Sequence, residues 1–141
     1  MEEKFIDIFT GLKRDYGYAD INSAYKDPAT GKLKLKYGWA AKELLESDYL
    51  DHLSGKKSIG IQPCDDDGLA KFGAIDIDSD EYDNFDLRKY LEIIDKKNIP
   101  VVPVKSKSGG LHIYVFFKEP VKASFVRNFL DKLLFTFDLK A

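Results

Sequence analysis

Two aspartates at the end of an apolar stretch are the residues that most directly indicate chemistry. Asp76 and Asp78 close the segment FGAIDID at 72–78. Side chains alternate between the two faces of a strand, so both carboxylates are expected on one face, with Ile75 and Ile77 on the other. Neighbouring carboxylates repel each other unless a cation lies between them, and their hard oxygens suit Mg²⁺ or Mn²⁺. The alternative is a solvated pair where a strand leaves its sheet, and the Asp-x-Asp pattern alone does not decide between them.

A loop rich in serine and glycine has groups that suit a triphosphate. It consists of Ser106, Lys107, Ser108, Gly109 and Gly110 and leads into a strongly β-prone segment. The glycines let the backbone approach a ligand closely, while amide N–H groups, serine hydroxyls and a lysine all bind phosphate oxygens. A simple Gly-Gly turn is the alternative.

A histidine follows this loop as the first polar residue of the next predicted strand. His112 shares its face with Tyr114 and Phe116. One ring nitrogen can donate a hydrogen bond to a phosphate while a neighbour fixes the other nitrogen. A purely structural histidine is the alternative. One predicted helix joins the two motifs, so an α/β connection can bring them to one sheet edge, where a metal beside a phosphate-binding loop performs phosphoryl or nucleotidyl transfer.

The composition indicates one soluble globular domain. The chain has 141 residues, 44% of them hydrophobic, and a net charge of −2, so its overall charge does not indicate nucleic-acid binding. The lone Cys64 excludes an internal disulfide and suits a reducing cytosol. No apolar run approaches the roughly 18–20 residues that a membrane span needs, and the N-terminus lacks signal-peptide features. We therefore expect a cytoplasmic protein without a membrane partner.

The elements that position these motifs alternate strands with helices. Hydrophobic periodicity predicts helices over 2–9, 39–53, 83–98 and 123–137 and strands over 58–62, 70–78, 99–104 and 111–117. Residues 16–37 are rich in Gly, Asp, Asn and Lys and are predicted to form a loop or an irregular hairpin. The strands 58–62 and 70–78 are predicted to pair as an antiparallel hairpin around a turn at 63–68. The order from 58 onward is β-β-α-β-β-α, which predicts a mixed sheet covered by helices.

The ordered motifs also resemble a known family. IDID at 75–78 followed by SKSGGLH at 106–112 is similar to the first two catalytic motifs of archaeo-eukaryotic primases, in the primase-polymerase branch of phages, plasmids and mobile elements. HLSGKKSIGIQPC at 52–64 and KEPVKASFVRNFL at 118–130 are similar to stretches of phage-type members. The resemblance covers roughly residues 9–134.

The resemblance implies a fold, a reaction and a set of site residues. The fold would be an α/β (α+β) primase-polymerase core, in which helices flank an RNA-recognition-like mixed sheet and an N-terminal α/β unit is added, all in one catalytic domain over 1–141. Asp76 and Asp78 would bind Mg²⁺ or Mn²⁺ and act in catalysis with His112. The incoming triphosphate would be held by Ser106, Lys107, Ser108, Gly109, Gly110 and His112.

The implied reaction is template-directed primase or polymerase chemistry. A 3′-hydroxyl would attack the α-phosphate of a nucleoside triphosphate on a DNA template and primer, and a replicative helicase, as a domain or a separate protein, is a candidate partner. The family needs a third carboxylate on a strand after the last helix. We expect this residue beyond Ala141, so the chain is expected to be a fragment that lacks the last part of the site, binds nucleotide and metal weakly and fails to polymerise.

Two other functions compete with this interpretation. The first is a different metal-dependent phosphoryl or glycosyl transferase that uses the Asp-x-Asp pair without a template. The second is a catalytically silent module that binds single-stranded nucleic acid by stacking on Tyr114 and Phe116. Outside these motifs, Lys32, Lys34 and Lys36 either contact phosphates or protect an edge strand. Tyr37 and Trp39 either stack on bases or anchor a helix.

Overall fold

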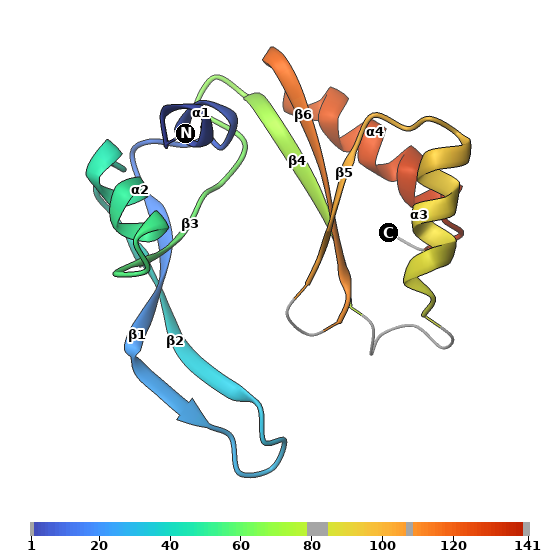
Figure 1. The fold of residues 1–141 in the computed structure, drawn as a ribbon. Coiled ribbons are helices and arrows are strands. Elements are labelled where there is room, and N and C mark those ends of the chain that lie inside the picture. Colours follow the sequence, from blue (N-terminus) through green and yellow to red (C-terminus); the bar gives the residue numbers. More distant parts are fainter. Residues whose placement is uncertain (1, 79–84, 107–108, 140–141) are drawn as a thin grey trace. The chain divides into compact units, whose positions relative to one another are not determined.

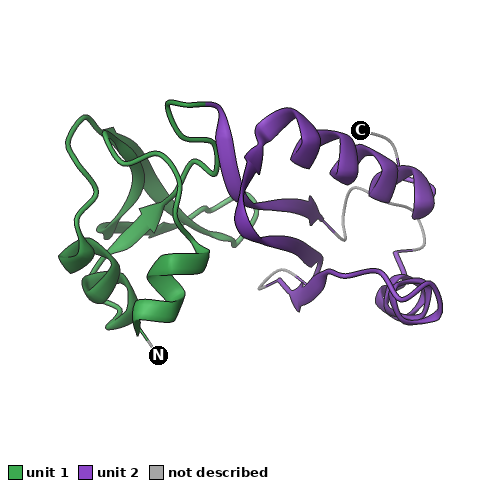
Figure 2. Ribbon diagram, turned by 90° about the horizontal axis from the view of Figure 1, so that it is seen from above, with its two compact units in different colours: residues 1–67 green, residues 68–141 purple. Residues whose placement is uncertain are grey.

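The computed structural model describes residues 2–78, 85–106 and 109–139, and it divides into two compact units. Unit 1 comprises residues 1–67 and unit 2 comprises residues 68–141 (Figure 2). Each unit contains its own three-stranded sheet and is described by itself. The α/β (α+β) fold class is confirmed, and unit 1 corresponds to the predicted N-terminal α/β unit. A single catalytic domain over 1–141 stays a prediction.

Unit 1 consists of a long hairpin, a short third strand and two helices (Figure 1). Its elements are α1 (Glu2–Ile8), β1 (Tyr16–Lys26), β2 (Leu33–Ala40), α2 (Glu46–Leu53) and β3 (Ser58–Gly60). The strand order is β2-β1-β3, and both pairings are antiparallel. The helices pack on one face of this sheet, where Tyr16 of β1 is buried against Leu44 and Tyr49.

Of two sequence predictions for this unit, one was confirmed in one of its alternatives and the other was wrong. Residues 16–37 form most of an antiparallel hairpin with an irregularity between Asp20 and Tyr25, so the predicted irregular hairpin is confirmed and the alternative of a loop is not. Glycine and lysine suit an exposed hairpin as well as a loop, so composition did not separate the two. The helix predicted from Trp39 begins only at Glu46, where the backbone N–H of Leu45 donates to the Asp48 carboxylate at 2.9 Å.

The predicted pairing of strands 58–62 and 70–78 was also wrong. β3 pairs with β1 through Gly17–Gly60, Tyr18–Ile59 and Ala19–Ser58, whereas the next strand, β4 (Leu69–Ile77), belongs to the sheet of unit 2. The acidic turn between them therefore joins two sheets. The alternation of side chains marks a strand but carries no information about its partner.

Unit 2 contains the predicted β-α-β-β-α succession from β4 onward. Its further elements are α3 (Leu87–Lys96), β5 (Val102–Lys105), β6 (Leu111–Lys122) and α4 (Ala123–Thr136). The strand order is β4-β6-β5. In the part of the chain that the structure describes, every strand pairing is antiparallel. The predicted mixed sheet was therefore wrong.

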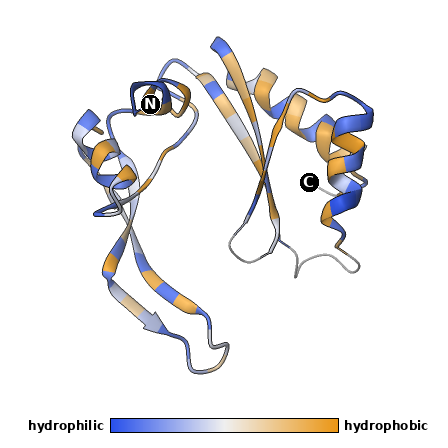
Figure 3. Cartoon of the chain, in the orientation of Figure 1, coloured by the Kyte–Doolittle hydropathy of each residue, from blue (hydrophilic) through white to orange (hydrophobic). Residues whose placement is uncertain are grey.

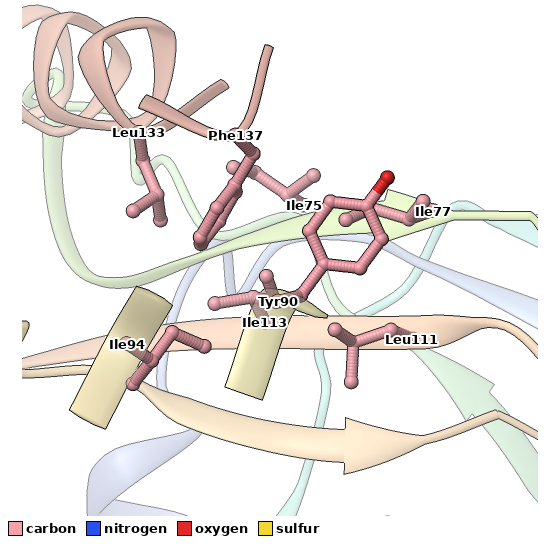
Figure 4. Packing of buried hydrophobic residues seen from close by; sticks show 8 residues of the cluster. All are labelled: Ile75, Ile77, Tyr90, Ile94, Leu111, Ile113, Leu133 and Phe137. Carbon is pink, nitrogen blue, oxygen red and sulfur yellow. The ribbon is translucent and has the colours of Figure 1, made fainter. Parts of the chain in front are cut away.

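The core of unit 2 lies between one face of its sheet and both of its helices. Figure 4 shows isoleucine and leucine side chains of β4 and β6 meeting residues of the helices; the cluster comprises Ile75, Ile77, Leu111, Ile113, Tyr90, Ile94, Leu133 and Phe137. Tyr90 and Phe137 pack edge to face with centroids 5.5 Å apart. Full burial of each aliphatic side chain contributes about 1.5–3 kcal/mol. Because alternate residues face this core, the intervening residues of β4 and β6 point to the opposite face.

None of the helices in the described ranges combines the length and the apolarity needed to cross a membrane.

Candidate functional site

The predicted site residues Asp76 and His112 lie directly opposite each other on neighbouring strands. They form a register pair of β4 and β6, and the Asp76 Oδ1 atom lies 3.0 Å from the His112 Nε2 atom. The alternation that buries Ile75 and Ile77 under the helices places both polar side chains on the uncovered face. The side chain of Asp76 is 63% exposed and that of His112 is 37% exposed, so both are accessible to a ligand.

The second predicted carboxylate is at the end of the same strand. Asp78 is half-buried and comes one residue after Ile77, whose partner across the ladder is Leu111. No group of three His, Cys, Asp or Glu side chains within 2–78, 85–106 and 109–139 could hold a metal ion. Mg²⁺ commonly takes only one or two carboxylates together with water and substrate phosphates. Asp76 and Asp78 fit that ligand set.

The predicted phosphate loop joins β5 to β6, and its base is packed against the end of the carboxylate strand. A Cβ atom at Gly110 would lie 2.2 Å from the Ile77 carbonyl oxygen and 3.2 Å from the Ser106 Oγ atom. Only glycine therefore allows this approach. The loop is closed by two hydrogen bonds, from Ser106 N to Gly110 O at 2.9 Å and from Gly109 N to Ser106 O at 3.1 Å. Gly109 has a φ of 95°, which also favours glycine.

Two members of the predicted loop lie outside the described residues. They are Lys107 and Ser108. The described part of the loop nevertheless places Ser106 and Gly110 beside the last residue of β4, one position from Asp76 and one from Asp78. The carboxylate strand and the glycine loop therefore meet at one end of one sheet, as the sequence analysis expected.

An aromatic row extends from His112 along the uncovered face. The rings of His112 and Tyr114 are perpendicular with centroids 6.3 Å apart, and those of Tyr114 and Phe116 are nearly parallel at 5.9 Å. Val104 pairs with His112 and Val102 pairs with Tyr114, so these valines share the face. They are 44% and 49% exposed. The two valines were not among the predicted site residues, although their alternation around Pro103 was a usable signal.

The charge pair with shifted pKa values lies in unit 1, outside the predicted site. Asp48 is buried and contacts Lys57, whose Nζ atom also donates to the Tyr16 hydroxyl at 2.6 Å. Burial alone would raise the pKa of Asp48, but hydrogen bonds from Lys57 and the Leu45 amide outweigh it and lower that pKa. Burial alone would lower the pKa of Lys57, but its bonds to Asp48 and Tyr16 raise it. This cluster ties β1, α2 and the residue before β3 together.

Comparison with known sequences decides the family. The sequence pattern of the archaeo-eukaryotic primase domain of TOTE conflict systems matches residues 13–139, which is nearly the whole chain. The chain belongs to this family. A search of curated proteins found no significant match.

Membership in the archaeo-eukaryotic primase family confirms the resemblance carried by the motifs. Domains of this family are generally metal-dependent nucleotidyltransferases. In this family member the match spans IDID at 75–78, the glycine loop and His112, so all the predicted site residues fall inside it.

Proposed function

We propose that this primase-family domain adds nucleotides to a strand on a DNA template, with nucleoside triphosphates as substrates and Mg²⁺ or Mn²⁺ as the cofactor. The observation that carries the proposal is the register pair of Asp76 and His112, beside a glycine loop packed on the end of the same strand. This arrangement provides an acidic group for a cation and hydrogen-bond donors for phosphates within one sheet edge.

Each residue has a separate role in the proposal. Asp76 and Asp78 would hold the divalent ion, which, when bound, neutralises triphosphate charge and makes the attacking hydroxyl more acidic. The Oδ1 atom of Asp76 is engaged by His112, which leaves its second oxygen for a cation. His112 would exchange Asp76 for a phosphate oxygen when the nucleotide binds.

The loop would bind the phosphates that leave as pyrophosphate. Its proposed donors are the backbone N–H groups of residues 107, 108 and 110, the Ser106 hydroxyl and the Lys107 and Ser108 side chains, since the Ser106 and Gly109 N–H groups already close the loop. In the reaction the 3′-oxygen of the primer forms a bond to the α-phosphorus, the bond from that phosphorus to the bridging oxygen breaks, and the hydroxyl proton passes to solvent. Tyr114 and the neighbouring valines would form an apolar surface beside the sugar or base.

Calorimetric titration of a deoxynucleoside triphosphate with Mn²⁺ tests the proposal. The wild type should bind, while Asp76→Asn and His112→Ala should each weaken binding by at least about tenfold, since each removes a charge-assisted contact. Asp138→Asn is the matched control, because it removes an exposed carboxylate after α4, at a left-handed position that asparagine tolerates. Equal binding by all four proteins would refute this site assignment.

A catalytically silent strand-binding module is the second candidate. The parallel rings of Tyr114 and Phe116, beside the exposed valines of β5, form a surface on which bases could stack. Single-strand binding that persists in an Asp76→Ala, Asp78→Ala double variant, together with no metal-dependent nucleotide binding by the wild type, would favour this module. Template-independent binding of a nucleotide-sugar would instead favour a different Asp-x-Asp transferase.

A further inference from the structure

A pocket in unit 1 lies over the sheet face that the helices of this unit do not cover. Its volume is about 330 Å³, and two register rows cross it: Trp39–Gly17–Gly60 and Tyr37–Ala19–Ser58. Residues paired in an antiparallel ladder share a face, so small side chains of β1 and β3 form the floor and the aromatic rings of β2 form a wall. This size is at the lower end of small-molecule sites, large enough for one aromatic base.

Trp39 and Tyr37 differ in how much of each ring packs against the rest of the protein. The Trp39 ring lies over Gly17, where an added Cβ atom would be 3.3 Å from it, so it also covers backbone. Tyr37 is 81% exposed, and Trp39 is still 55% exposed. The buried Tyr16 side chain and the helices α1 and α2 belong to the other face. Two large rings side by side on an uncovered face indicate an interaction surface.

The strand that carries these rings is also basic. The hairpin over 16–40 contains four lysines and two aspartates, an excess of two positive charges in a chain whose net charge is −2. Lys34 and Lys36 alternate with Leu33, Leu35 and Tyr37 along β2, and Figure 3 shows this alternation of hydrophilic and hydrophobic residues. By strand alternation Lys34 and Lys36 point to the face opposite the rings, and Lys34 is paired with Asp27. Because β2 is an edge strand, the exposed Lys36 side chain lies at the border of the sheet, where a long side chain can reach past the edge toward the rings.

We propose that this surface, defined by Tyr37, Trp39 and the floor of Gly17 and Gly60, binds an unpaired nucleic-acid strand. A base would stack on the aromatic rings above the glycine floor, and the phosphates would pass along the edge of β2, within reach of Lys36. Stacking rings beside a basic track form the usual site for single strands. No acidic side chain lines the pocket among the residues that the structure describes, which suits an anionic ligand. The inference rests on the proposed function, because templated synthesis needs a place for the unpaired template.

Trp39 provides a direct probe, since it is the only tryptophan of the chain. A dT12 oligonucleotide titrated without nucleotide or metal should quench its fluorescence. Tyr37→Ala should weaken binding roughly 5- to 150-fold, the effect of losing one stacked base. Lys36→Gln should reduce the slope of log affinity against log salt by about 0.7, the value for one phosphate contact with a single strand. An rU12 arm distinguishes DNA from RNA.

Control variants separate this surface from the rest of the protein. Phe135→Ala removes a ring that is 86% exposed on α4 and should leave strand affinity unchanged. Gly60→Val should fill the floor of the pocket and weaken strand binding. Gly60→Ala should be tolerated by the fold, because its Cβ atom would lie 3.7 Å from Gly17. Circular dichroism spectra that match the wild type would show that each variant is folded.

Three results would overturn the inference. The first is a folded wild type whose Trp39 fluorescence dT12 does not quench. The second is strand binding that Tyr114→Ala abolishes while Tyr37→Ala does not. The third is a Tyr37-dependent dimer in sedimentation, which would assign the surface to a second copy of the chain. Mn²⁺-dependent nucleotide binding, measured on the same variants, should survive Tyr37→Ala. If the wild type binds dT12 but shows no Mn²⁺-dependent nucleotide binding, the proposed site in unit 2 is refuted and the strand surface in unit 1 is not.

Discussion

The Asp76 carboxylate and the His112 imidazole form a cross-strand pair, with Oδ1 3.0 Å from Nε2, on a sheet face that the helices of unit 2 leave uncovered. Such a pair on an otherwise apolar and aromatic face contributes little to packing. Its partly exposed position suits two groups that exchange each other for a ligand.

The two side chains should act on nucleotide affinity as a coupled pair. In a double-variant cycle of Asp76→Asn and His112→Ala, the effects should deviate from additivity by about 0.5–3 kcal/mol, as found for residues in direct contact. Calorimetry with Mn²⁺ and a deoxynucleoside triphosphate measures each corner of the cycle. Strict additivity would show that the two residues serve separate sites. The free energy of unfolding should change little in Asp76→Asn, because the carboxylate is mostly exposed.

Gly110 should be intolerant of any side chain. An alanine would place its Cβ atom 2.2 Å from the Ile77 carbonyl oxygen, so the loop must move away from the end of β4. We expect Gly110→Ala to lower the free energy of unfolding by about 1–3 kcal/mol and to weaken nucleotide binding more than tenfold. Urea denaturation and calorimetry measure the two effects.

Gly60→Ala is the matched control for that glycine. Its Cβ atom would meet backbone only at 3.7 Å, an ordinary contact, and the position belongs to unit 1. It should retain wild-type nucleotide affinity. Normal nucleotide binding by Gly110→Ala would mean that the packing of this loop on β4 is unrelated to the substrate.

The core of unit 2 should depend strongly on Ile113. This side chain is 0% exposed, and it lies among the residues that join the sheet to both helices. Ile113→Ala should lower the free energy of unfolding by about 2–5 kcal/mol, through lost burial and the cavity left behind. Ile113→Val should cost about 0.5–1.5 kcal/mol. Similar values for both in urea denaturation would show that the site collapses around the smaller residue.

The Asp48–Lys57 pair should make the stability of unit 1 depend on pH. The pKa of Asp48 is lowered on folding, so its contribution is present above the unfolded pKa of about 3.9 and is lost as the pH falls through the folded pKa. The pKa of Lys57 is raised, so its contribution is present below about 10.4 and is lost as the pH rises through the folded pKa.

The Asp48→Asn variant tests this pair. At pH 7 it should lower the free energy of unfolding by about 1–3 kcal/mol, because Lys57 and Tyr16 lose a charged partner. The difference from wild type should shrink as the pH falls below about 4. A difference that stays constant between pH 7 and pH 3 in urea denaturation would assign the effect to packing. Asp51→Asn is the control, since that carboxylate is half exposed and its lysine partner is 74% exposed.

Local sequence determined the chemistry of this protein and the strands that carry it. The alternation in FGAIDID was enough to place Ile75 and Ile77 in the core and Asp76 on the opposite face, because strand geometry repeats every two residues. The same reasoning placed His112 on one face with Tyr114 and Phe116. The ordered motifs were also sufficient to predict the family, which the match over residues 13–139 confirms.

Only the tertiary structure decided which strands pair and in which register. Ser58–Gly60 joins β1 and not the strand that follows it, and His112 is opposite Asp76 and not Ala74. A shift of one residue would have placed the histidine on the other face, and nothing local records that choice. The need for glycine at 110 likewise comes from the Ile77 carbonyl, 33 residues away in the chain. Pairing energies depend on contacts between distant segments, so periodicity predicts the strands while the three-dimensional packing assembles the site.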